Sequence, residues 1–95
     1  PTATGADGQL VGDGDPYAQT VQALKNIESA LTRAGASLKD VTKVTIFICN
    51  PHDVPKGRSI LQEYFGDYPP ASTLCVLRGL ANPNFLLEIE AIAAV

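Results

Sequence analysis

The 95-residue chain contains no methionine and no tryptophan, and it has only two cysteines and one histidine. Two cysteines are too few for a disulfide scaffold, and one histidine without paired cysteines does not make a zinc site. We therefore expect Cys49 and Cys75, both within apolar segments, to be buried unpaired thiols. We interpret His52 as a solvated turn residue, and we expect no metal and no cofactor.

Long apolar runs and an excess of basic charge are also missing. The longest apolar run, residues 85–95, is interrupted by Glu88 and Glu90, whereas a membrane span needs about 18 uninterrupted apolar residues. Seven basic residues against ten acidic ones give a net charge of -3, and binding a phosphate backbone needs a basic surface. With no secretory signal pattern at its start, the chain is expected to be cytoplasmic, without a membrane or nucleic-acid partner.

The residues that are present predict one folded domain covering residues 1–95. Hydrophobic residues make up 45% of the chain and charged residues 18%, which is typical of a globular protein. The aliphatic residues Val, Ile, Leu and Ala dominate, so the predicted core is aliphatic. At this length the chain holds a single core.

Local signals predict a loop with a hairpin tip over residues 1–14 and then a long helix. Asp15-Pro16 is a helix start, since Asp accepts a hydrogen bond from a free amide and Pro at the first position loses no needed donor. Gly35 supplies the left-handed stop, so we expect the helix over residues 16–34. Its apolar stripe is formed by Tyr17, Val21, Leu24, Ile27 and Leu31.

The second half of the chain predicts three strands and one helix. Residues 41–49 form a β-branched run that is apolar on both faces, which is typical of a central strand. A helix capped by Asp53 is expected to end near Phe65, followed by strands 73–77 and 85–95 joined as a hairpin. The order predicts an α+β fold with both helices on one face of the sheet. The other face needs a cover, so we expect an oligomer.

The last strand carries the strongest chemical signal. Period-two spacing places Glu88 and Glu90 on one strand face among apolar neighbours. They are either the acidic solvent face of an edge strand or a partly desolvated carboxylate in a cleft that accepts a proton. The pattern leaves both interpretations open.

Two segments add a resemblance to a known family. PPAS at 69–72 and LANPNFLLEIEAIA at 80–93 resemble the C-terminal signature of the YjgF/RidA family, also called the endoribonuclease L-PSP family. The similarity extends from Gly8 to Val95. It implies a fold like that of small chorismate mutases and a homotrimer with clefts between subunits. Family members usually begin with an extra strand pair, absent here, so we expect either a shortened variant or a natural N-terminal part not represented in the sequence.

The resemblance also implies an activity without a cofactor. Family members hydrolyse enamine and imine acids, such as 2-aminoacrylate, to a 2-keto acid and ammonia. Glu88 matches the carboxylate that positions the attacking water. An Arg that follows Pro-Ala grips the substrate carboxylate, but this chain has Ser72 and then Thr73. Arg58 and Arg78 are either substitutes for that Arg or solvated surface charges.

Taken together, the residues and the resemblance predict a RidA-like protein that binds a small imine, enamine or carbonyl metabolite between subunits. Glu88 is the candidate catalytic residue, and Ser72, Thr73 and Arg58 are the candidate ligand-binding residues. A non-catalytic binding or interaction module on the same scaffold is the alternative, so whether the protein is an enzyme stays open. The net charge disfavours a ribonuclease.

Overall fold

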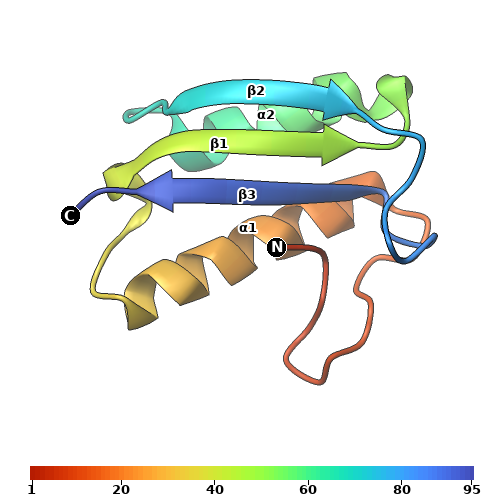
Figure 1. Ribbon diagram of the computed structural model, residues 1–95, viewed down its shortest axis with the longest axis horizontal. Helices are drawn as coiled ribbons and strands as arrows, with labels where there is room; N and C mark the ends of the chain where they lie inside the picture. The colour runs from red at the N-terminus through yellow and green to blue at the C-terminus, as the bar shows by residue number, and fades with distance from the viewer.

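The computed structural model describes residues 1–95 and has two helices packed on a three-stranded sheet (Figure 1). The helices and strands are α1 (Pro16–Arg33), β1 (Val41–Ile48), α2 (Val54–Phe65), β2 (Ala71–Val76) and β3 (Leu87–Ala93). Short 3-10 turns, Leu38–Asp40 and Pro51–Asp53, precede β1 and α2. Both helices lie on the same face of the sheet, which confirms the predicted α+β fold. None of the helices is both long and apolar enough to cross a membrane.

The sheet has the order β2-β1-β3, with β1 parallel to β2 and antiparallel to β3. The expected central position of β1 is confirmed. The expected hairpin between the last two strands is wrong, because β1 lies between them. The crossover through α2 returns the chain parallel to β1 at one edge, and residues 77–86 then carry it to the other edge.

The start and stop signals of α1 act as predicted. The Asp15 side chain accepts a hydrogen bond from the Ala18 amide at 3.1 Å, and Gly35 has a φ of 78°. The expected apolar stripe is only partly right, because Tyr17 is 50% exposed. The buried positions of the helix are Gln19, Thr20, Ala23, Leu24 and Ile27.

The start of α2 is placed as predicted but is held differently. Asp53 occupies the N-cap position, yet its side chain makes no capping hydrogen bond. The side chain of Asn50 instead accepts from the His52 amide at 3.0 Å and stabilises the 3-10 turn before the helix. Asn50 therefore caps the 3-10 turn, and no side chain caps α2 itself.

The core lies between the helices and one face of the sheet. Alternate β1 residues, Val44, Ile46 and Ile48, are at most 3% exposed and belong to the same buried cluster as Leu24 of α1 and Ile60 of α2. The intervening residues of β1 point to the face that no helix covers, here called the open face. Alternation thus gives β1 one face in the core and one facing outward.

The two cysteines are unpaired, as expected, but they are only partly buried. Cys49 follows β1 directly, and its thiol donates to the Phe85 carbonyl at 3.8 Å. Cys75 pairs with Phe47 in the sheet and therefore lies on the open face. An apolar strand sequence does not bury a thiol when one face of the strand has no cover.

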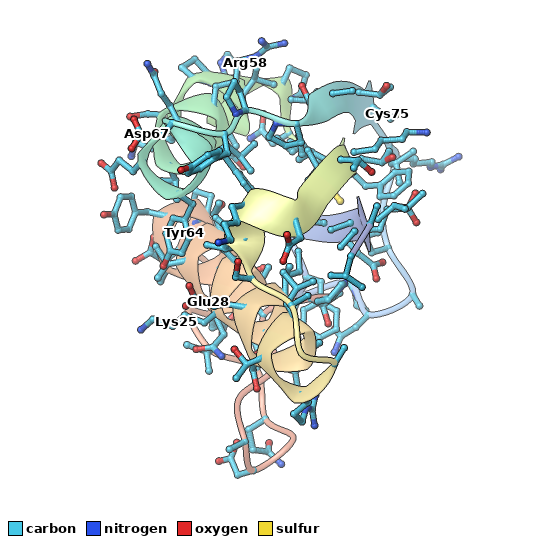
Figure 2. All side chains as sticks on the ribbon, turned by 90° about the vertical axis from the view of Figure 1, so that its left-hand side faces the viewer. Lys25, Glu28, Arg58, Tyr64, Asp67 and Cys75 are labelled. Atoms are coloured by element: carbon cyan, nitrogen blue, oxygen red, sulfur yellow. The ribbon has the colours of Figure 1, made fainter.

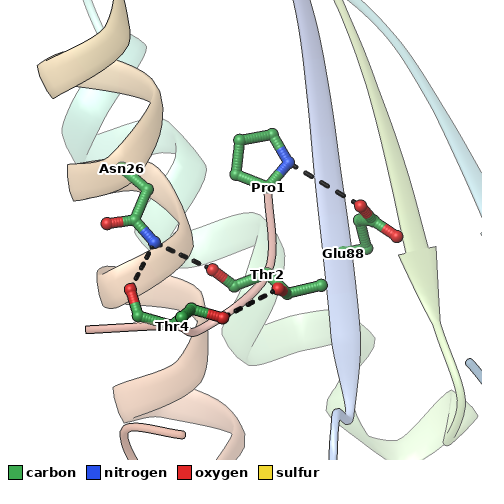
Figure 3. Close-up of polar contacts among 5 residues, drawn as sticks. All are labelled: Pro1, Thr2, Thr4, Asn26 and Glu88. Carbon is green, nitrogen blue, oxygen red and sulfur yellow. Dashed lines mark hydrogen bonds and ion pairs between the residues drawn. The ribbon is translucent and has the colours of Figure 1, made fainter. Parts of the chain in front are cut away.

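The N-terminal segment is docked onto α1 and the outer edge of β3. A single bridge between Thr4 and Leu10 closes the loop whose hairpin tip was predicted. The Asn26 amide of α1 donates to the Thr2 and Thr4 carbonyls at 2.9 and 2.8 Å (Figure 3). The Ile89 amide of β3 donates to the Pro1 carbonyl at 3.0 Å.

Candidate functional site

A groove of about 610 Å³ lies between α2 and the edge strand β2. Its apolar lining includes two buried β1 residues, Val44 and Ile46, together with Leu61, Phe65 and Leu74. Its polar side chains are Arg58, Gln62 and Ser72. This combination of an apolar surface and a few polar groups is typical of a small-molecule site.

The structure brings two predicted site residues, Arg58 and Ser72, into this groove. Arg58 lies one helical turn before Gln62 on α2, so the two side chains share a face of the helix. Ser72 pairs with Val44 of β1 and therefore lies on the face of β2 that the helices cover. Arg78 lies beyond the end of β2 and does not line the groove.

Glu88 lies elsewhere, on the open face of β3. It pairs with Phe47 of β1, its side chain is 42% exposed, and its Oε2 lies 3.8 Å from the Pro1 nitrogen (Figure 3). Glu90, which pairs with Thr45, follows on the same face. The carboxylate of Glu88 is therefore partly desolvated and still accessible.

Ser72 and Glu88 lie on opposite faces of the sheet. Ser72 shares the face of Val44, whereas Glu88 shares the face of Phe47, three residues along the same strand. Thr73 lies on the open face with Glu88, but β1 separates their strands. With strands about 4.8 Å apart, the two backbones are about 10 Å apart or more. One chain alone does not assemble the predicted set of residues.

The apolar residues that line the groove were not among the site residues predicted from the sequence. Leu61 and Phe65 lie on the inner side of the predicted helix, where apolar side chains are expected to belong to the core. The usable signal was their spacing, because residues three, four and seven positions after Arg58 lie along its side of the helix. What the spacing does not reveal is that β2 leaves that side open.

Charged groups away from the groove do not form a second reactive centre. Burial, followed by the negative charge of Glu28, raises the pKa of Tyr64 above its usual value of 10.0. Figure 2 shows Tyr64 near Glu28, well separated from Arg58. No group of three or more His, Cys, Asp or Glu residues is arranged to hold a metal ion.

Comparison with known proteins shows to which family the chain belongs. The family model described as Endoribonuclease L-PSP matches residues 2–95. A RutC family protein of Pyrococcus abyssi is 40% identical over 86 residues, which are 90% of this chain and 66% of that protein. A protein of Acinetobacter baylyi named 3-aminoacrylate deaminase RutC is 43% identical over 82 residues, which are 86% of this chain and 64% of that protein. The chain thus spans about two thirds of the length of these curated relatives.

Solved structures give the same result. A Rid family protein of Yersinia pestis has a TM-score of 0.90 at 36% identity, covering 99% of this chain and 73% of that one. A protein of Thermotoga maritima described as a putative endoribonuclease has a TM-score of 0.92 at 34% identity, with the same coverage. These neighbours agree with the chorismate mutase-like fold that the resemblance implied. The chain belongs to the endoribonuclease L-PSP family, which is the YjgF/RidA family.

Proposed function

We propose that this protein binds a small imine, enamine or carbonyl metabolite in a cleft between the subunits of a homotrimer, and hydrolyses imines to a keto compound and ammonia. The observation that carries the proposal is the position of Glu88. Its carboxylate is 42% exposed on the open face, and the groove with Ser72 lies on the opposite side of the sheet. A second subunit is therefore needed to bring the carboxylate and the groove together.

The proposed chemistry uses only the side chains of the protein and water. An enamine first takes a proton from water on carbon, which gives the iminium ion. Glu88 accepts a proton from a second water as its oxygen adds to the iminium carbon, which gives a neutral carbinolamine. Glu88 returns that proton to the nitrogen, the C–N bond breaks, the hydroxyl proton passes to solvent, and the products are ammonia and a carbonyl compound. The hydroxyl of Ser72 or Thr73 donates a hydrogen bond to the ligand.

The comparisons support the class of substrate. The Acinetobacter baylyi relative is named for the deamination of 3-aminoacrylate, which is an enamine acid. The Glu88 carboxylate, whose side chain is 42% exposed, supplies an accessible base for the addition of water to such a substrate.

Ammonia release tests the proposal and offers a matched control. We expect the purified protein to accelerate ammonia release from enamine and imine acids generated in solution. Glu88→Gln should lower this rate at least about a hundredfold, since it removes the base but keeps the shape. Glu90→Gln, on the same face of the same strand, should leave the rate within about twofold. A Glu88→Gln protein as active as the wild type would contradict the proposed role.

A binding module without turnover is the second candidate. The observation in its favour is Ser72, which stands where the resemblance implies a carboxylate-binding Arg. Such a module needs the groove but no activated water. It predicts that ligands bind equally well to the wild type and to Glu88→Gln, and that neither releases ammonia.

A further inference from the structure

The structure assigns to Arg58 the binding of a ligand carboxylate in the groove, with the hydrocarbon part of that ligand on the apolar lining beside it. This inference rests on the proposed function, because it concerns the ligand of the same cleft. Arg58 then sets the specificity of the cleft for its ligand. If Arg58 binds the carboxylate, the preferred ligand is a small monoanionic 2-oxo or 2-imino acid with a branched or aromatic side chain.

The first argument is charge. Arg58 is the only charged side chain that lines the groove, and no acidic residue lines it. Arg58 also forms no ion pair and no side-chain hydrogen bond anywhere in residues 1–95. Its guanidinium fork is thus free for a carboxylate, which such a fork binds through two parallel hydrogen bonds.

The second argument is the arrangement of polar and apolar groups. On α2, Arg58 and Gln62 are accompanied by Leu61 and Phe65, and Phe65 is only 4% exposed. Across the groove, Ser72 and Leu74 of β2 repeat the pairing of a polar with an apolar residue. Both walls therefore suit a ligand with a charged end and a hydrocarbon end.

The third argument is size. A volume of 610 Å³ corresponds to about twenty water molecules at about 30 Å³ each. A three-carbon acid would leave the exposed parts of Leu61 and Leu74, two lining residues that are only partly buried, in contact with water. Each methylene that the ligand adds over this lining should tighten binding about fourfold.

The geometry also decides between the two arginines that the sequence left open. Arg78 is exposed, follows the end of β2 and lies outside the groove. Arg58 is placed in the groove by its position on α2. Arg78 therefore serves as the matched control, since its substitution removes the same charge from the molecule.

Calorimetric titration with stable keto acids tests the inference. The probes are 4-methyl-2-oxopentanoate, pyruvate and the methyl ester of the former. We expect the wild type to bind 4-methyl-2-oxopentanoate at least tenfold more tightly than either of the others. Arg58→Gln should weaken its binding at least tenfold, Arg58→Lys less, because lysine keeps the charge without the fork. Arg78→Gln should bind like the wild type.

Two results would overturn the inference. One is equal binding by the wild type and Arg58→Gln, and the other is wild-type binding of the ester as tightly as of the acid. Arg58 is exposed, so its substitution leaves the core intact, and an unchanged thermal transition verifies this. Ammonia release by wild type and Glu88→Gln is measured separately. Absence of ammonia release by the wild type, with Arg58-dependent binding intact, would contradict the hydrolysis and leave the assignment of Arg58 standing.

Discussion

At the scale of single residues, Gln19 shows how a polar side chain can hold distant segments together. It is fully buried in α1. Its amide nitrogen donates to the Gly12 and Asn84 carbonyls at 3.2 and 3.0 Å, and its oxygen accepts from the Leu86 amide at 2.8 Å. Helical periodicity places a glutamine on the solvent side, and no local signal reveals partners more than sixty residues away.

We expect Gln19→Leu to lower the free energy of unfolding by about 2 kcal/mol or more, because it leaves the Leu86 amide without its partner in the interior. Gln62→Leu, at an exposed position of α2, should change it by less than about 0.5 kcal/mol. Urea denaturation of both variants measures the difference. Equal effects would mean that the Gln19 hydrogen bonds contribute nothing beyond helix propensity.

At the scale of elements, the sequence predicts what is encoded locally. Asp15-Pro16 and Gly35 mark the ends of α1, and the β-branched run of residues 41–48 marks β1. The partners of the strands are not local, so the pairing of β2 and β3 was predicted wrongly. For the same reason, the strand pattern pointed to Glu88 and the family resemblance to Ser72, but neither revealed that the two residues lie on opposite faces.

The two helix starts offer a direct comparison of capping. Asp15→Ala should destabilise the protein by about 1 kcal/mol, since it removes an observed bond to the Ala18 amide. Asp53→Ala should cost clearly less, since Asp53 makes no such bond at the start of α2. Thermal unfolding of both variants distinguishes them. A larger loss for Asp53→Ala would show that the dipole of α2, and not the capping bond, sets the stability.

At the scale of the whole molecule, the open face of the sheet is the main apolar surface that no other part of the chain covers. Phe47 and Cys75 lie on it only partly buried, and Ile92 is 60% exposed. No helix covers this face, and the proposed cleft needs a residue from it. Covering this face and completing the proposed cleft would both require another copy of the chain.

We predict a homotrimer, so light scattering should give about three times 10.0 kDa. Ile92→Glu should shift the mass toward that of the monomer, because it places a charge on the open face. Tyr17→Glu, at a 50% exposed position on α1, should leave the trimer intact. A monodisperse wild-type monomer at micromolar concentration would contradict both the trimer and the shared cleft.

The antiparallel pairing of β1 with β3 also bears on how the protein is made. During synthesis, the edge of β1 that pairs with β3 has no native partner until residues 87–93 have been added. At about 5 to 20 residues per second, the delay between Ile48 and Leu87 is about 2 to 8 seconds. Over that time the nascent chain exposes an apolar strand edge that can pair with other chains. Ribosome pausing between these two strands should therefore increase aggregation more than pausing within α1.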